Sequence, residues 1–231
     1  MEFGMSLTDA TSFNIQFEGG KPILIDTLSF EKYVEGKPWI AYKQFCEQFL
    51  APLTLMVDKD INLSKLLIPF AGSIPLDLVN KLLPLKSKIR PTTFMHLVAH
   101  AASQKKYDES PVAGHKGFIN KNSLMGLIEN LESAINKLIW KPKNTVWTDY
   151  YSEKKRPSYE GRAFSKKKSI VSNFLKTAKT KTLWDLGANT GEFSRMSAKL
   201  GIFTVSMDFD PTVVEINYQK IKSSSEKNIL P

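Results

Sequence analysis

The stretch TLWDLGANTGEF, residues 182–193, decides the fold of the C-terminal part of the chain. It begins with a short apolar run, reaches the acid Asp185, and then enters a small polar loop between Gly187 and Gly191. An apolar run that ends in a glycine-containing turn is typical of a strand followed by a tight loop. The sequence therefore predicts a strand that leads into a loop able to contact a ligand.

The residues after this loop predict further alternation of helix and strand. Helical spacing over 192–200 is followed by a second apolar strand over 203–207. Asp210 is a good N-cap, and Pro211 fits the first position of the next helix, where its missing N–H is not needed. The order β-α-β-α indicates the start of a parallel, doubly wound sheet of the Rossmann type.

The first part of the chain predicts a β-hairpin and then helices. SFNIQFEGGKPILID, residues 12–26, alternates apolar and polar residues on both sides of a Gly19–Gly20 turn. Helical spacing of apolar residues begins after Pro38 and is clearest over 123–139, where Ser123 can cap the helix. The predicted fold class is therefore α/β, with a β-hairpin and a helical N-terminal region ahead of the first β-α-β-α units of an incomplete Rossmann-like sheet.

Three regions are expected: the hairpin and helices over 1–140, a basic, aromatic connector over 141–164, and the N-terminal part of the Rossmann-like domain over 165–231. The whole net charge of +9 lies within 141–181, which holds twelve Lys or Arg and three Asp or Glu. Such a segment can bind nucleic acid or an acidic partner. No nucleic-acid-binding motif accompanies the charge, so a solvated surface is the favoured interpretation.

The composition favours a cytoplasmic protein. Cys46 is the single cysteine among 231 residues, so no internal disulfide can form and a reducing compartment is expected. Residues 1–20 lack the basic start and the apolar run of a secretory signal. The uncharged stretch 66–76 is shorter than the roughly 20 apolar residues that span a bilayer, so no membrane partner is expected.

The glycine loop has the residues of a nucleotide-like ligand site, because such ligands bind at the carboxyl end of the first strand. Gly187 and Gly191 lack a Cβ and allow close approach of a ligand, and Asn189 tolerates positive φ. Asp208 follows the second strand at the position of an acid that binds ribose hydroxyls.

The spacing of the loop argues against the commonest phosphate-binding motifs. GANTG lacks the third glycine of the dinucleotide motif GxGxxG, and no GK[ST] follows it as in a P-loop. Asp185, two residues before the first glycine, suits a ligand with a positive charge better than an anionic pyrophosphate. A different nucleotide-binding Rossmann enzyme, for example one that binds NAD, stays open as an alternative.

The stretch TLWDLGANTGEFSRMSAKLGIFTVSMDFDPTVVE, residues 182–215, resembles the first two motifs of class I S-adenosylmethionine-dependent methyltransferases. These enzymes carry hhDxGxGxG in the first loop and an acid at the end of the second strand. The resemblance implies an enzyme that binds S-adenosylmethionine. Its methionine end would contact Asp185, Gly187, Ala188, Asn189 and Gly191, its ribose Asp208, and its adenine Phe209. Asn189 departs from the pattern, since the family has glycine there.

Other segments are similar to a bacterial group of methyltransferase-like proteins related to nodulation host-specificity factors. They are FNIQFEGGKPILIDTLSFE (13–31), PWIAYKQFCEQFLAPL (38–53) and VWTDYY (146–151). This resemblance implies no particular methyl acceptor. Because methyl transfer from a sulfonium rests mainly on holding donor and acceptor in line, the sequence identifies no catalytic side chain.

The resemblance also implies a seven-stranded sheet, of which the sequence predicts two strands. We therefore expect a fragment, a truncated gene product or a piece completed by a partner, with self-association through exposed sheet edges. A non-catalytic module that uses 141–181 to contact nucleic acid or an acidic protein is an alternative function. His96 and His100 have the spacing of metal ligands on a helix, but HEXXH is absent and only His115 remains, so no metal site is predicted.

Overall fold

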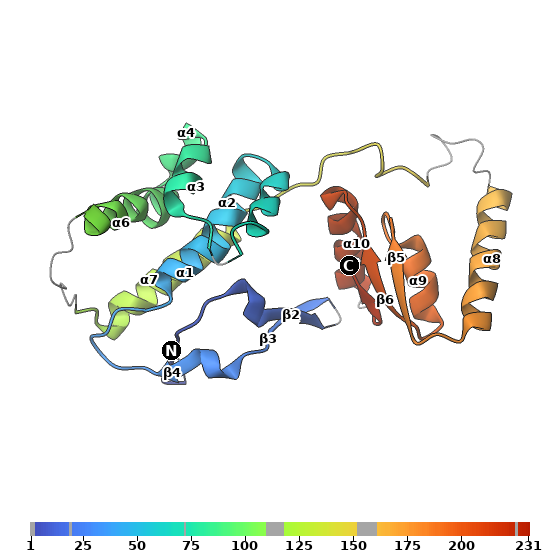
Figure 1. The fold of residues 1–231 in the computed structure, drawn as a ribbon, viewed down its shortest axis with the longest axis horizontal. Coiled ribbons are helices and arrows are strands. Elements are labelled where there is room, and N and C mark those ends of the chain that lie inside the picture. Colours follow the sequence, from blue (N-terminus) through green and yellow to red (C-terminus); the bar gives the residue numbers. More distant parts are fainter. Residues whose placement is uncertain (1–2, 19, 72, 110–117, 152–160, 225) are drawn as a thin grey trace. The chain divides into compact units, whose positions relative to one another are not determined.

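The computed structural model describes residues 3–18, 20–71, 73–109, 118–151, 161–224 and 226–231. They form two compact units, drawn in Figure 1. Unit 1 contains Met1–Ile15 and Leu24–Trp140, and unit 2 contains Gln16–Ile23 and Lys141–Pro231. The chain is thus a mixture of helices and small sheets. Within the described ranges, no helix is long and apolar enough to cross a membrane.

The strands of the N-terminal part form two small antiparallel pairs. β1 (Met5–Leu7) pairs with β4 (Phe30–Lys32), with Ser6 opposite Glu31. β2 (Ile15–Glu18) and β3 (Lys21–Leu24) form the predicted hairpin. Gly20 has φ +74° in its turn, a conformation that glycine adopts without strain. Gly19 lies outside the described residues.

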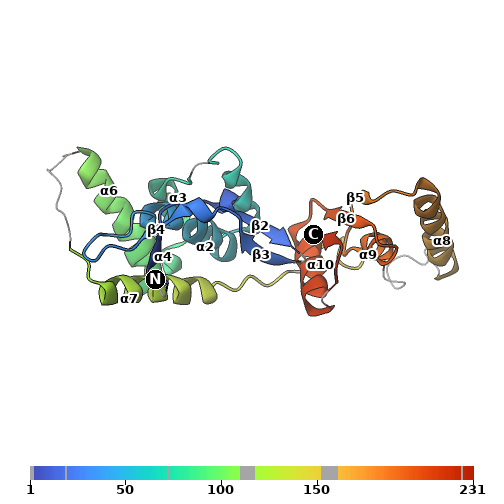
Figure 2. The same ribbon diagram turned by 90° about the horizontal axis from the view of Figure 1, so that it is seen from below.

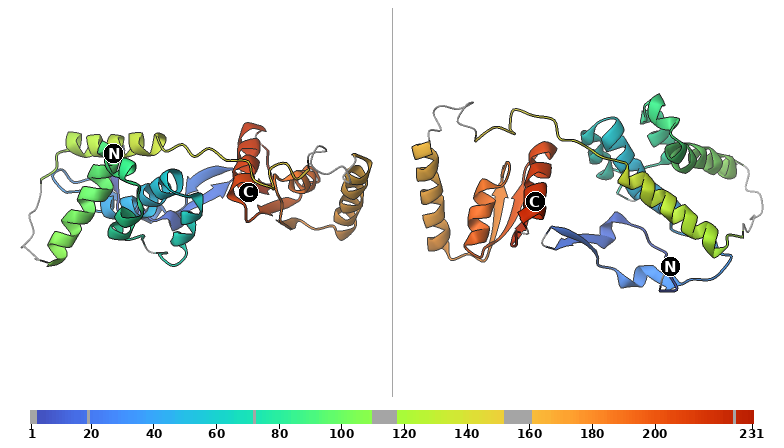
Figure 3. Two further views of the ribbon diagram at one scale, coloured as in Figure 1. Left: turned by 90° about the horizontal axis from the view of Figure 1, so that it is seen from above. Right: turned by 180° about the vertical axis from the view of Figure 1, so that it is seen from behind.

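Helices supply the rest of unit 1, as the apolar spacing predicted. They are α1 (Tyr42–Phe45), η3 (Cys46–Leu50), α2 (Ala51–Asp58), η4 (Ile61–Leu67), α3 (Leu76–Leu82), α4 (Leu85–Lys88), α5 (Pro91–Thr93), η5 (Phe94–Ala99), α6 (His100–Glu109) and α7 (Lys121–Asn136). Two short 3-10 turns, η1 (Ser12–Asn14) and η2 (Thr27–Ser29), lie among the strands. α7 lies along the continuous helix made by α1, η3 and α2 (Figure 3).

The core of unit 1 lies between these helices. Cys46 and Leu55 are fully buried, and Leu97 and Leu131 pack into the same cluster from η5 and α7. The wider π-helical turn η3 precedes Pro52, whose ring would meet the carbonyl four residues earlier in a regular helix. The proline is therefore accommodated by a local change of helical pitch.

The N-cap of α7 is Asn120 and not the predicted Ser123. The Asn120 side chain accepts a hydrogen bond from the Ser123 backbone N–H at 2.8 Å. Asn120→Ala is expected to lower the free energy of unfolding by about 1 kcal/mol, because one N–H of the first turn loses its acceptor. Ser123→Ala is the control and is expected to change it by less than about 0.5 kcal/mol. Equal effects of the two substitutions in urea unfolding would contradict this assignment.

Unit 2 contains a three-stranded parallel sheet in the order β5-β6-β7. Its elements are α8 (Gly161–Ala178), β5 (Thr182–Leu186), α9 (Glu192–Lys199), β6 (Phe203–Met207), α10 (Pro211–Ser224) and β7 (Ile229–Leu230). Trp184 lies opposite Val205 in the pairing of β5 with β6. The strands and helices from 182 onward confirm the predicted alternation, and β7 is a third strand that the sequence did not indicate.

One face of this sheet carries both α9 and α10 (Figure 2). Ser194 of α9 and Asn217 of α10 hydrogen-bond to the same residue, Ser206 of β6, at 2.9 and 2.8 Å. The fully buried positions of α9 are Ser194 and Ser197. The close approach of the helix to the strands thus favours small polar side chains at these positions.

Candidate functional site

The loop after β5 has a left-handed backbone at three alternate residues. Gly187, Asn189 and Gly191 have φ values of +75°, +52° and +81°. Asparagine is among the few residues other than glycine that adopt this conformation at low cost. Asn189 therefore fits the backbone position at which the family motif has glycine.

Hydrogen bonds hold this loop against the end of β6. The backbone N–H groups of Gly187 and Ala188 both donate to the Met207 carbonyl at 2.9 Å. The N–H of Asn189 donates to Asp208 Oδ2 at 2.9 Å, and the N–H of Asp210 donates to Asp208 Oδ1 at 3.0 Å. Each carboxylate oxygen has two lone pairs, so Asp208 keeps capacity to accept further hydrogen bonds.

Asp185, the acid in β5 just ahead of the loop, ends a buried polar chain. Ser194 donates its hydroxyl proton to Asp185 Oδ2 at 2.6 Å. Because that proton is used, Ser206 donates to Ser194 Oγ at 2.9 Å, and Asn217 Nδ2 donates to Ser206 Oγ at 2.8 Å. Three residues of α9, β6 and α10 therefore fix the orientation of the Asp185 carboxylate.

The two glycines of the loop have different surroundings. A Cβ at Gly187 would meet no heavy atom of the described residues within 4 Å, so the space beside this residue is open among them. A Cβ at Gly191 would overlap the side-chain oxygen of Asn217 and approach Arg195 Nη1 to 2.6 Å. Arg195 is held there because it also donates to the Thr190 carbonyl at 2.5 Å. Gly191 is therefore required for packing, whereas Gly187 leaves room for a ligand.

Gly191→Ala is expected to destabilise unit 2 by about 2–4 kcal/mol, because left-handed backbone strain adds to overpacking. Gly187→Ala, which meets no neighbour, is the matched control and is expected to cost about 1–2 kcal/mol. Urea-dependent hydrogen exchange of the β5 and β6 amides would measure both values. A smaller loss of stability for Gly191→Ala than for Gly187→Ala would show that the Asn217 and Arg195 side chains move aside to make room for the methyl group.

Residues of the connector are attached to this loop through individual contacts that the sequence did not predict. Asn189 Nδ2 donates to the Trp147 carbonyl at 2.7 Å, and Thr145 Oγ1 donates to Asp210 Oδ2 at 2.5 Å. The Trp147 ring contacts the Phe209 ring edge to face, with centroids 5.8 Å apart. The asparagine in place of the motif glycine was the signal available, since glycine has no side chain to reach Trp147.

An aromatic cluster continues from this attachment toward α8. The centroids of Tyr150 and Tyr151 lie 5.1 Å apart, and Tyr151 lies 5.1 Å from Phe164. Lys168 stands 4.5 Å from the Phe164 ring centroid and pairs with Glu192 at 3.0 Å. Part of the basic segment is therefore engaged within unit 2. Tyr159, another aromatic residue of the connector, lies outside the described residues.

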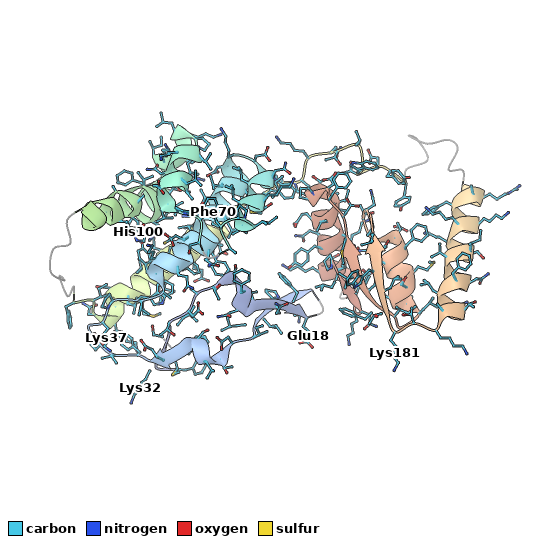
Figure 4. All side chains as sticks on the ribbon, viewed as in Figure 1. Glu18, Lys32, Lys37, Phe70, His100 and Lys181 are labelled. Atoms are coloured by element: carbon cyan, nitrogen blue, oxygen red, sulfur yellow. The ribbon has the colours of Figure 1, made fainter. Side chains whose placement is uncertain are left out.

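The histidine pair belongs to a buried network in unit 1. Tyr42 OH and Asn130 Oδ1 lie 2.8 Å from the two ring nitrogens of His96, which is fully buried. The Tyr42 ring stacks on His100, labelled in Figure 4, at a centroid distance of 4.8 Å. Both nitrogens of His96 thus have partners, and no group of three metal-ligating side chains occurs in the part of the chain that the structure describes. His115 is outside it.

The titratable groups in and beside this network are unsuited to nucleophilic chemistry. Burial raises the pKa of the Cys46 thiol to about 12, so almost no reactive thiolate exists at neutral pH. Burial also raises the pKa of Tyr42 and lowers that of His100. The network therefore stabilises the helical core, and the loop of unit 2 remains the candidate site.

Comparison with known proteins gives one informative match. The whole length of this chain is similar to a part of nodulation protein NoeA. It is 32% identical over 239 residues to NoeA of Rhizobium meliloti (strain 1021), and the match covers 100% of this chain and 49% of NoeA. The chain thus spans about half the length of the relative it matches, and a relation to nodulation proteins is supported as the sequence predicted. No family model matches the chain. No solved structure matches it.

Proposed function

We propose that this chain carries the cofactor-binding part of an S-adenosylmethionine-dependent methyltransferase with a Rossmann-like sheet. The observation that carries the proposal is the loop between β5 and α9, with open space beside Gly187 and acids at the ends of two adjacent strands. Ligands of parallel sheets bind outside the carboxyl ends of the strands, where this loop lies. The similarity to NoeA extends over the same residues.

In this proposal each loop residue has a distinct task. The Asp185 carboxylate, oriented by Ser194, attracts the positively charged methionine end of the cofactor. The remaining lone pairs of Asp208 accept hydrogen bonds from the ribose hydroxyls, and the exposed ring of Phe209 packs on the adenine. Ala188, Asn189 and Gly191 shape the backbone between these contacts.

The chemistry follows from the charge on the cofactor. When bound, S-adenosylmethionine supplies a methyl group on a sulfonium, and the sulfur leaves as a neutral thioether that keeps the bonding electron pair. The acceptor contributes a lone pair and loses a proton if it carried one. The residues of this chain would hold the donor in one orientation, an effect that contributes up to about 7–11 kcal/mol in favourable systems.

Titration calorimetry with three ligands would test the proposal. Saturable binding of S-adenosylhomocysteine, the product form of the cofactor, is expected. Preference for NAD would favour another nucleotide-binding enzyme, and preference for heparin would favour a polyanion-binding module based on residues 141–181. The pairing of Lys168 with Glu192 disfavours that last alternative, since it occupies part of the basic surface. Binding of none of the three would contradict the methyltransferase proposal.

A further inference from the structure

Residues 145–151 of the connector, which we call the strap, are held together by hydrogen bonds of their own. The Thr145 hydroxyl accepts the Trp147 N–H at 3.2 Å, and the Thr145 carbonyl accepts the Thr148 hydroxyl at 2.8 Å. The Trp147 carbonyl accepts the Tyr150 N–H at 3.2 Å. Because these bonds all lie within the strap, we expect it to dock or to leave as one piece.

Three contacts attach the strap to the part of unit 2 where the proposed cofactor would bind. The Thr145 hydroxyl donates to Asp210 Oδ2 at 2.5 Å, and the Trp147 carbonyl accepts from Asn189 Nδ2 at 2.7 Å. The Trp147 ring contacts the Phe209 ring. Asn189 lies in the loop after β5, whereas Phe209 and Asp210 follow β6. The strap therefore contacts the residues at the carboxyl ends of both strands.

Asn189 is buried, and its side chain makes two bonds that glycine could not make. Its Oδ1 accepts the Thr190 N–H at 2.8 Å, and its Nδ2 donates to the Trp147 carbonyl. Its backbone N–H donates to Asp208, a bond that glycine would keep. Glycine would also meet the left-handed φ without strain. What asparagine adds to the loop is therefore a tether to the strap.

The strap also orients an exposed aromatic ring. Phe209 is 76% exposed, so few neighbours restrain its side chain. The Trp147 ring lies against it with centroids 5.8 Å apart and planes at 84°. Edge-to-face contact of this kind is a favoured geometry of aromatic pairs. Trp147 thus holds the Phe209 ring in one orientation, which a flat ligand such as adenine needs for stacking.

We propose that Asn189 and Trp147 are positioning residues of the cofactor site, and that they couple docking of the strap to binding of S-adenosylmethionine. This inference rests on the proposed function. Asn189 links the strap to the loop that would hold the methionine end, and Trp147 orients Phe209 at the adenine end. Coupling of this kind is reciprocal. A bound ligand stabilises the docked strap by the same factor by which the docked strap raises the affinity.

Amide hydrogen exchange across 145–151 tests the tether without any ligand. Asn189→Gly keeps the left-handed backbone and the bond to Asp208 but removes the tether. Exchange of the strap is therefore expected to become about three- to tenfold faster, the factor that corresponds to one net hydrogen bond. Asn228→Gly is the matched control, because Asn228 is also left-handed, with φ +63°, and precedes β7. It is expected to leave exchange of the strap unchanged.

Titration calorimetry with S-adenosylhomocysteine tests the coupling. Trp147→Ala is expected to weaken the affinity about fivefold, because the Phe209 ring loses its edge-to-face partner, and Trp147→Phe is expected to restore most of that loss. Asn189→Gly is expected to weaken the affinity about threefold, since the strap is docked for less of the time. Phe174→Ala, on α8, removes a ring that is 70% exposed and is expected to leave the affinity unchanged.

The same ligand provides a second measurement of the coupling. Saturating S-adenosylhomocysteine is expected to slow exchange of the strap in the wild type at least about threefold. A merely structural role of the strap predicts no such protection. Unchanged exchange of the strap on binding would therefore contradict the coupling.

The outcomes separate this proposal from the proposed function. Unchanged exchange of the strap in Asn189→Gly, or equal changes in Asn189→Gly and Asn228→Gly, overturns the tether. Wild-type binding that either Asn189→Gly or Trp147→Ala leaves intact overturns the coupling, while the methyltransferase proposal stands. The same holds if Trp147→Phe binds as weakly as Trp147→Ala. Absence of binding to the wild type overturns both proposals.

Discussion

Gly187→Val is expected to abolish measurable binding of S-adenosylhomocysteine. No heavy atom of the described residues would lie within 4 Å of a Cβ at Gly187, so a branched side chain would occupy the volume that the proposal gives to the ligand. The φ of +75° adds strain of about 1–2 kcal/mol, which is small beside the loss of the binding surface. Titration calorimetry of wild type and variant under identical conditions would measure the difference.

Gly201→Val provides a matched control for this substitution. Gly201 has φ +79°, and a Cβ there would meet no heavy atom within 4 Å in the part of the chain that the structure describes. Valine at this position therefore meets similar strain in similarly open space. Gly201 lies between α9 and β6, at the end of the strand opposite the loop. Gly201→Val is expected to retain binding. Retained affinity in Gly187→Val, or equal losses in both variants, would contradict a ligand beside Gly187.

The loop itself could be predicted because its signals are local. An apolar run, a left-handed turn and an N-capped helix each depend on a few neighbouring residues, and residues 182–211 contain all of these signals in order. The same locality explains why the hairpin and the helical spacing of unit 1 were recognisable. Short windows of sequence show where a helix or a strand forms, but they do not show which strands pair with one another.

Long-range contacts decided the features that the sequence did not reveal. β7 has two residues, and its pairing of Ile229 with Thr204 depends on how α10 returns the chain to the sheet. The bond from Asn189 to Trp147 joins residues 42 positions apart. Neither contact produces a periodic pattern in the sequence. Asn120 and Ser123 are both good capping residues, and only the backbone geometry shows that Asn120 is the N-cap.

Polar side chains are buried on the face of the sheet that α9 and α10 cover. Ser194 and Ser206 are buried beside Asp185 because a carboxylate on the covered face requires donors there. An apolar residue at position 194 would leave that carboxylate without its donor. Serine on α9 is thus a consequence of the acid in β5, which links the composition of the helix to the candidate site.

Asp208→Ala is expected to weaken binding of S-adenosylhomocysteine about ten- to a hundredfold, since hydrogen bonds to a charged group contribute about 1.5–3 kcal/mol. Part of this loss arises within the protein. The N–H groups of Asn189 and Asp210 both donate to Asp208, and Asn189 is buried, so alanine leaves a buried donor unsatisfied. Affinity and stability must therefore be measured on the same variant, by calorimetry and urea unfolding.

Asp208→Asn separates the two contributions to that loss. Its amide oxygen can still accept the Asn189 N–H, whereas its NH2 group faces the Asp210 N–H and cannot accept from it. The loop is therefore expected to lose less stability than in Asp208→Ala, where both N–H groups lose their acceptor. The carboxylate charge that the proposal places beside the ribose is removed, so the affinity is expected to stay well below that of wild type. Glu215→Gln on α10 removes a charge elsewhere in unit 2 and is expected to leave the affinity unchanged. If Asp208→Asn binds as tightly as wild type while Asp208→Ala does not, Asp208 supports the loop and does not hold the ribose.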